Sequence, residues 1–144
     1  MVILLAVGVS SCASLGPPYP DFINLTDPSP YPFSSAVRSG PYLFLSGQIG
    51  TKTEDGKAVL VSGGIEAETK QTFENIKAIL AKANSSLDRV IKCTVMMADM
   101  AEWPKMNEIY TTFFPGKKPA RSAFGATGLA LGARVEIECI ALVK

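Results

Sequence analysis

A helical repeat of apolar side chains between residues 65 and 83 constrains the fold of this chain more than any other feature. Its members are spaced so that they fall on one face of a helix: Ile65, Phe73, Ile76, Ile79, Leu80 and Ala83. Segments that alternate between apolar and polar residues, as half-buried strands do, occur elsewhere in the chain. The pattern predicts a domain of the α+β class, in which the apolar face of the helix packs on a sheet.

Two strands are expected before this helix. Two short segments rich in β-forming residues, Ser34 to Arg38 and Tyr42 to Ser46, flank the turn signal Ser39-Gly40-Pro41. Such an arrangement is typical of a hairpin. A polar stretch with a turn at Asp55-Gly56 follows, so the domain is expected to open with two paired strands.

A third strand and a second helix are expected after the first helix. Residues Val90 to Ala98 alternate, and one face of this strand carries Ile91, Cys93, Val95 and Met97. Asp99 can cap a helix that runs to about Phe114, because an aspartate accepts hydrogen bonds from the first N–H groups of a helix. The inner face of that helix would carry Trp103, Met106, Tyr110 and Phe113. Cys93 is then a core residue.

Two further strands, Ala120 to Ala126 and Ala133 to Val143, are expected to close the domain. The predicted order is therefore ββαβαββ, with a hairpin at each end and a mixed sheet that has both helices on one face. The other face would be bare. Since a bare sheet face with apolar content is usually covered by another subunit, a homo-oligomer is expected.

Composition excludes several classes of function. The 144 residues are enough for one domain, and a net charge of +1 leaves no basic face for nucleic acid. The chain has no histidine, which excludes a Ser-His-Asp triad. Its cysteines, Cys12, Cys93 and Cys139, are scattered singly, so we expect neither a metal site nor a dense disulfide framework. Cofactor-free chemistry, or no chemistry, remains.

The N-terminal segment, residues 1–14, resembles a signal peptide or a lipoprotein signal. An apolar run from Met1 to Val9 is too short to span a membrane and is followed by small residues and Cys12, a candidate for lipidation. Residues 15–32 are rich in proline and are expected to be an extended tether. We therefore expect an exported protein, in the periplasm or anchored to a membrane through Cys12. The alternative is an N-terminal strand or helix that packs on the domain of a cytoplasmic protein.

Several motifs occur in the order and at nearly the separations typical of one family. They are Ser46-Gly47-Gln48-Ile49-Gly50, Asn75 to Leu80, Asp99-Met100, Met106 to Tyr110, Pro119-Ala120-Arg121-Ser122 and Val135 to Glu138. In these motifs the chain resembles RidA/YjgF proteins, the reactive intermediate deaminase or endoribonuclease L-PSP-like family. The resemblance covers the chain from about Pro30 to Lys144, and we expect the RidA-like domain to be residues 33–144.

The resemblance implies a chorismate-mutase-like fold assembled as a homotrimer, in which the sheets form an inner barrel and the sites lie in clefts between subunits. It also implies cofactor-free hydrolysis of enamine or imine intermediates of the 2-aminoacrylate type to a 2-keto acid and ammonia. Ribonuclease activity has been attributed to some members. The nearly neutral charge and the absence of histidine argue against that activity here.

The resemblance assigns two catalytic residues, Arg121 and Glu136. An arginine fork can hold the carboxylate of a 2-imino acid, and a carboxylate can deprotonate a water aimed at the imine carbon. Ser46, Gly47 and Asn107 match positions that border the site. Considered without the family, Arg121 and Glu136 would instead be read as a cross-strand ion pair that contributes little.

Two substrate-site positions depart from the family pattern. Phe33 stands where the family usually has tyrosine, which removes one hydroxyl from the site, and Ala123 stands where many members carry cysteine. A second function therefore stays open, in which a trimer binds small carboxylates without turning them over. Both functions imply a small-molecule imine or carboxylate as the ligand.

Overall fold

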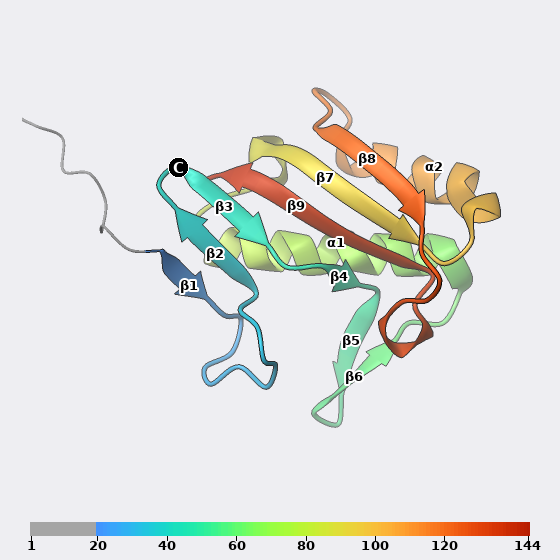
Figure 1. Cartoon of the computed structure of the whole chain (residues 1–144), viewed down its shortest axis with the longest axis horizontal. Coiled ribbons are helices and arrows are strands. Elements are labelled where there is room, and N and C mark those ends of the chain that lie inside the picture. The colour runs from blue at the N-terminus through green and yellow to red at the C-terminus, as the bar shows by residue number, and fades with distance from the viewer. Residues whose placement is uncertain (1–19) are drawn as a thin grey trace, which may run out of the picture.

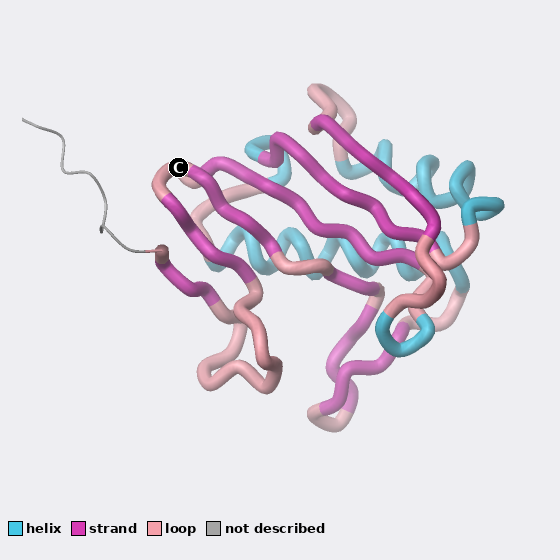
Figure 2. The backbone as a smooth tube through the Cα atoms, in the orientation of Figure 1, coloured by secondary structure: helices cyan, strands magenta, loops and turns pink. Residues whose placement is uncertain are grey.

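One mixed sheet forms the body of the computed structural model, which describes residues 20–144 (Figures 1 and 2). The strands lie in the order β1-β2-β3-β9-β7-β8, and β4 pairs with β9 beside this series. The sheet is open, with β1 and β8 at its edges. Its strands are β1 (Asp21–Ile23), β2 (Ala36–Ser39), β3 (Tyr42–Leu45), β4 (Gln48–Ile49), β7 (Val90–Met97), β8 (Ala120–Gly125) and β9 (Val135–Leu142).

Two helices cover one face of this sheet, as predicted (Figure 1). Helix α1 (Gly64–Lys82) buries its predicted apolar face, and Phe73 and Ile76 are fully shielded from solvent. Helix α2 (Trp103–Phe113) follows a short 3-10 turn, Met100–Glu102, whose start is capped by the carboxylate of Asp99. Within residues 20–144, no helix lies on the opposite face of the sheet.

The N-terminal hairpin is confirmed, whereas the expected C-terminal hairpin is wrong. Strands β2 and β3 pair antiparallel, but β8 and β9 do not pair with each other. Helix α2 connects β7 to β8 as parallel neighbours, and β9 inserts between β3 and β7. The alternate buried residues of β9 show that one of its faces packs on the helices, whereas its place between β3 and β7 is set by strand pairing.

A hairpin absent from the predicted order occupies the polar stretch before α1. Strands β5 (Thr51–Glu54) and β6 (Lys57–Leu60) pair antiparallel around the turn at Asp55-Gly56. This hairpin projects from the sheet in Figure 1. It is mostly exposed, so it shows no buried face by which the sequence could reveal it.

One predicted core side chain of β7 is turned to solvent. Cys93, Val95 and Met97 are buried as expected, but Ile91 is 41% exposed and Val90 is buried in its place. A register shift between Val90 and Lys92 is the cause. An extra residue at such a bulge reverses the alternation of the residues that precede it.

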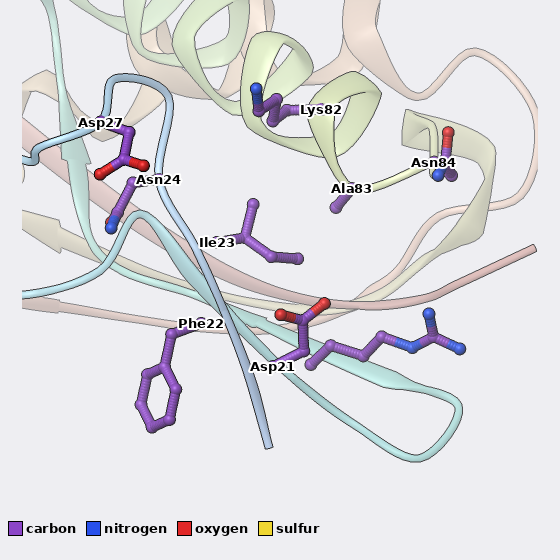
Figure 3. Close-up of a pocket in the computed structure, with 9 residues that line it drawn as sticks. Asp21, Phe22, Ile23, Asn24, Asp27, Lys82, Ala83 and Asn84 are labelled. Carbon is purple, nitrogen blue, oxygen red and sulfur yellow. The ribbon is translucent and has the colours of Figure 1, made fainter. Parts of the chain in front are cut away.

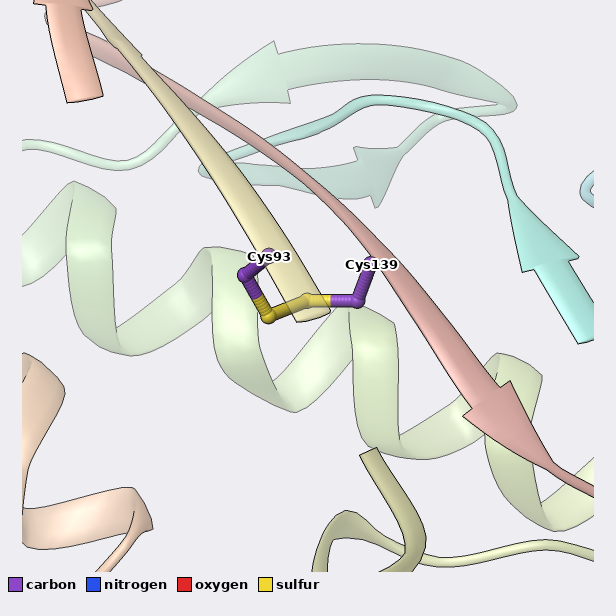
Figure 4. Close-up of a disulfide and its surroundings, with 2 residues drawn as sticks. All are labelled: Cys93 and Cys139. Atoms are coloured by element: carbon purple, nitrogen blue, oxygen red, sulfur yellow. A yellow bond between two sulfur atoms is a disulfide. The ribbon is translucent and has the colours of Figure 1, made fainter. Parts of the chain in front are cut away.

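Cys93 and Cys139 form a disulfide between the central strands β7 and β9 (Figure 4). The two residues lie directly opposite each other in the antiparallel register, and both are buried against helix α1. The alternation of β7 predicts a core position for Cys93 but does not predict this bond. Spacing in the chain could not reveal it, because a disulfide depends on which residues face each other across the strands.

Part of the expected tether belongs to the sheet. Strand β1 pairs with β2, with Phe22 opposite Val37, so ordered structure begins before the expected boundary at residue 33. The Asn24 side chain accepts a hydrogen bond from the Ser35 amide and ties the two segments together. The apolar segment 1–14, with Cys12, lies outside the described residues. Within residues 20–144, no helix has the length and apolar character needed to cross a membrane.

Candidate functional site

Helix α2 and strand β8 place Arg121 in an aromatic cage. The guanidinium carbon lies 4.4 Å from the ring centroid of Tyr110 and 5.1 Å from that of Trp103. The Arg121 Nη1 group donates a hydrogen bond of 2.9 Å to the side-chain oxygen of Asn107. Since residues 103, 107 and 110 share one helix face, α2 supplies the whole cage. We call these four residues the Arg121 half-site.

The cage leaves part of the guanidinium free to bind a ligand. Arg121 is half-buried. Among the three guanidinium nitrogens, only Nη1 has a hydrogen-bond partner within the described residues. The remaining donors can form the two parallel bonds that a planar carboxylate accepts. The hydroxyl of Tyr110 is buried without a hydrogen-bond partner in the described part of the chain. Burial raises the pKa of Tyr110, although the charge of Arg121 acts in the opposite direction.

Glu136 lies with Ser46 and Gly47 at the junction of β3, β4 and β9. A side-chain carbon placed on Gly47 would lie 2.0 Å from Oε1 of Glu136, so only glycine allows this approach. The Ser46 hydroxyl donates a 2.7 Å hydrogen bond to the Ser34 carbonyl, so its proton is not free to bind a substrate or water. Its oxygen can still accept. We call Ser46, Gly47 and Glu136 the Glu136 half-site.

Helix α1 holds the segment that carries Gly47 in place. The Asn75 side chain donates to the carbonyls of Ile49 and Thr51, at 3.0 and 2.9 Å. Gly50 packs against the backbone of Glu68, and the Glu68 carboxylate accepts a 2.8 Å hydrogen bond from the amide of Arg134. These contacts fix both strands of the Glu136 half-site to one helix.

Phe33 and Ala123 lie beside different half-sites. Phe33 directly precedes Ser34, the hydrogen-bond partner of Ser46, and is half exposed. Ala123 lies two residues after Arg121 on the same face of β8, where its small side chain packs at the margin of the core.

Arg121 and Glu136 face opposite sides of the sheet. Arg121 contacts helix α2, whereas Glu136 alternates with the buried residues Val135 and Ile137 and therefore faces away from the helices. Strand β7 separates β8 from β9, which puts their axes roughly 10 Å apart. The cross-strand ion pair considered as the alternative is therefore wrong, and one chain cannot bring the two half-sites to one small ligand.

The helical spacing predicts Trp103 and Tyr110 as core residues and not as site residues. Their contact with Arg121 depends on β8 lying parallel to β7 beside α2, which the sequence pattern did not indicate. One signal was present in the chain, because Trp103, Asn107 and Tyr110 have the spacing of one helix face. That spacing connected both aromatic residues to Asn107, a predicted site residue.

A separate cavity of about 430 Å³ lies between β1 and the end of α1 (Figure 3). Ile23 points toward the helix end and Phe22 points away from it. The lining residues include acidic and basic side chains, namely Asp21, Asp27, Arg38 and Lys82. None of the predicted site residues lines this cavity, so it is distinct from both half-sites.

Comparison with known proteins connects these half-sites to a family. A family model described as Endoribonuclease L-PSP matches residues 26–143. The 2-iminobutanoate/2-iminopropanoate deaminase of Mus musculus is 42% identical over 111 residues, which are 77% of this chain and 81% of the relative. The chain belongs to the RidA/YjgF family. The predicted family membership is thus confirmed.

Other RidA/YjgF relatives support the same assignment. The chloroplastic Reactive Intermediate Deaminase A of Arabidopsis thaliana is 41% identical over 110 residues, covering 76% of this chain and 58% of that longer protein. The crystal structure of E. coli TdcF with bound serine matches with a TM-score of 0.73 and 29% identity, over 81% of this chain and 91% of that chain. The α+β fold predicted from the sequence is therefore the fold of this family.

Proposed function

We propose that this protein hydrolyses 2-imino acids, and their enamine tautomers, to 2-keto acids and ammonia. The observation that carries the proposal is the caged guanidinium of Arg121, which has free donors for a carboxylate. The names of the relatives, which describe deaminases of 2-iminobutanoate and 2-iminopropanoate, support the same chemistry. No step of the proposed reaction calls for a cofactor.

The reaction can be written with the side chains of the two half-sites. Arg121 binds the carboxylate of the substrate and orients the adjacent C=N carbon. The imine reacts in its protonated form: Glu136 accepts a proton from water as the water oxygen bonds to that carbon, and the electrons of the C=N double bond become the lone pair of an amine. The proton on Glu136 then passes to the amine nitrogen, and the C–N bond breaks with its electron pair on nitrogen, so that ammonia leaves. The hydroxyl group returns its proton to Glu136 as the carbonyl forms.

The proposed site needs two subunits. Arg121 and Glu136 face opposite sides of one chain, so we propose a homotrimer in which the Arg121 half-site of one subunit meets the Glu136 half-site of the next. Strand β8 is a sheet edge, which leaves the Arg121 half-site beside an uncovered boundary of the subunit. The bare sheet face carries the exposed rings of Tyr42 and Phe44 beside charged side chains such as Glu138, and the two rings provide apolar contact area for the assembly.

Ammonia release tests the activity. Freshly generated 2-iminopropanoate is mixed with the wild type, with Arg121→Ala and with the matched control Arg38→Ala, which removes an arginine outside both half-sites. We expect the wild type and the control to exceed the uncatalysed rate and Arg121→Ala to lose at least about a hundredfold in kcat/KM, as for other lost charged contacts. Equal rates for the wild type and buffer would refute the proposal.

Subunit mixing tests the shared site. Arg121→Ala and Glu136→Gln are each expected to be inactive, but refolding them together should restore about a quarter of wild-type activity, because random mixing in a cyclic trimer leaves that share of sites intact. A site contained within one chain would stay inactive after mixing.

A second function follows from Phe33. The side chain of this residue carries no hydroxyl, and the hydroxyl of Ser46 already donates to the Ser34 carbonyl, so the Glu136 half-site has few groups left to orient a water. A trimer that binds small carboxylates without turnover would show pyruvate binding by calorimetry, sensitive to Arg121→Ala, with no ammonia release above background.

We also propose that the protein is exported. The apolar segment 1–14 supports this location, and so does the Cys93–Cys139 disulfide, because such bonds persist in oxidising compartments. Cell fractionation of the wild type and of Cys12→Ser tests the proposal. Export without anchoring in Cys12→Ser would identify a lipoprotein, whereas cytoplasmic recovery of the wild type would refute export.

A further inference from the structure

Two aromatic rings stack on each other next to the Glu136 half-site and remain open to solvent. The ring centroids of Tyr31 and Phe33 lie 5.3 Å apart with an interplanar angle of 11°, and each residue is 52% exposed. Because about half of the surface of each residue stays in water, the packing of this aromatic pair contributes little to the stability of the fold of its own chain. Exposed apolar surface of this kind is typical of a binding site.

Hydrogen bonds hold the loop that presents this pair. The Ser29 hydroxyl lies within hydrogen-bond distance of the Tyr31 amide and of the Tyr31 and Phe33 carbonyls. At the base of the loop, Ser35 bonds to the side chain of Asn24 and to the amide of Leu25. The stack is therefore organised before any ligand arrives, which lowers the entropy lost on binding.

One hydrogen bond connects the loop that carries the stack to the proposed site. Phe33 is followed by Ser34, whose carbonyl accepts the 2.7 Å hydrogen bond from Ser46 in the Glu136 half-site. A 2-imino acid has three substituents to accommodate at its reacting carbon: the carboxylate, the nitrogen and the side chain. In the proposed reaction Arg121 binds the carboxylate, while Glu136 activates the water that adds to the C=N carbon. The aromatic stack is then the neighbouring surface that remains for the side chain.

We propose that the Tyr31–Phe33 stack is the side-chain subsite and that it selects 2-imino acids with aromatic side chains. This inference rests on the proposed function, because it uses the same site. A planar aromatic group can contact the exposed part of either ring in an offset or edge-on arrangement, which a methyl or ethyl group cannot match. Small aliphatic imines are consequently poorer substrates than aromatic ones.

The ratio of two specificity constants tests this inference. An amino-acid oxidase generates the imines of phenylalanine and alanine in the assay, and kcat/KM is measured for each with the wild type, Tyr31→Ala and Phe33→Leu. We expect the wild type to favour the aromatic imine and Tyr31→Ala to lower the ratio about five- to tenfold, the size of an aromatic contact. Phe22→Ala, which removes an exposed ring on β1, should leave the ratio unchanged.

A measurement of keto-acid binding distinguishes failure of this inference from failure of the proposed function. If neither imine is hydrolysed, the deaminase proposal fails, and calorimetry with phenylpyruvate and pyruvate still tests the subsite. Tighter binding of phenylpyruvate that is lost in Tyr31→Ala and weakened in Phe33→Leu supports the inference. Equal affinity for the two keto acids, or an aromatic preference that survives in both folded variants, overturns it.

Discussion

Arg121 shows how the fold can hold a half-buried positive charge without neutralising it. A half-buried guanidinium loses part of its hydration, and here two ring faces and the amide oxygen of Asn107 replace it. None of these partners carries a negative charge. The positive charge is therefore not neutralised within the half-site, which leaves it available to attract an anion.

Trp103 is expected to act by positioning Arg121. Removing its ring in Trp103→Leu should raise KM for 2-iminopropanoate about three- to tenfold with a smaller change in kcat, since a cation–π contact contributes about 0.5–1 kcal/mol or more. Trp103→Phe should recover most of the loss. Steady-state kinetics measures both constants, and a Trp103→Leu enzyme with wild-type KM would exclude the positioning role.

Gly47 and Gly50 allow a matched test of function against stability. A methyl group at Gly47 meets the flexible end of Glu136, so Gly47→Ala should displace the carboxylate and lower kcat at least about tenfold while the fold remains stable. At Gly50 the new carbon would lie 2.6 Å from the Glu68 Cα, and Gly50→Ala should destabilise the fold by about 1–3 kcal/mol. Urea unfolding and ammonia release distinguish the two. A Gly47→Ala protein with full activity would contradict the proposed role of Glu136.

At the scale of elements, α2 and β7 organise the Arg121 half-site together. The crossover through α2 returns the chain as β8, parallel to β7, and places Arg121 in register with Cys93. Cys93 is in turn bonded to Cys139 of β9. Arg121, Cys93 and Cys139 thus lie in one row across the adjacent strands β8, β7 and β9. The disulfide joins two of these strands covalently.

The Cys93–Cys139 bond is expected to stabilise the native state. Reduction, or the double change Cys93→Ala with Cys139→Ala, should lower the free energy of unfolding by about 2–4 kcal/mol, because the bond restricts the unfolded chain. Chemical denaturation measures the difference, with Cys12→Ser as the control. Alkylation of both Cys93 and Cys139 in the denatured but unreduced protein would show that the bond is absent.

At the scale of the whole molecule, the part of the chain that the structure describes covers only one face of the sheet. Phe44 is 45% exposed on the bare face, opposite Ile140 of β9 in the register. Covering such a surface by another subunit removes apolar area from water at about 25 cal/mol per Å². The proposed trimer would bury this surface in addition to completing the sites.

Phe44→Glu should separate assembly from folding. A further charge in place of the exposed Phe44 ring would have to be buried in the trimer, so the variant is expected to be monomeric, to retain its helical signal and to lose activity. Light scattering coupled to gel filtration, together with circular dichroism, measures these properties. A trimeric Phe44→Glu protein, or a monomer with full activity, would rule out the shared-site arrangement.

Much of the fold follows from local pattern. The repeat from Ile65 to Ala83 has the period of a helix, and the alternation after Val90 has the period of a strand. Residues that recur with such a period lie on one face of the element, and both α1 and β7 appeared where expected. The family motifs likewise indicated Arg121, Glu136 and Gly47 as candidate site residues without coordinates. These residues could be predicted because each motif is a short stretch of the chain.

The arrangement of these pieces depended on contacts that no short stretch contains. The place of β9 between β3 and β7, the bond from Cys93 to Cys139 and the aromatic cage of Arg121 each join segments far apart in the chain. The opposition of Arg121 and Glu136 across the sheet has the same origin, because it is set by strand pairing. The sequence by itself predicted which residues would carry the proposed chemistry, and the tertiary structure alone decided that they lie in two half-sites, since only pairing and packing determine which faces meet.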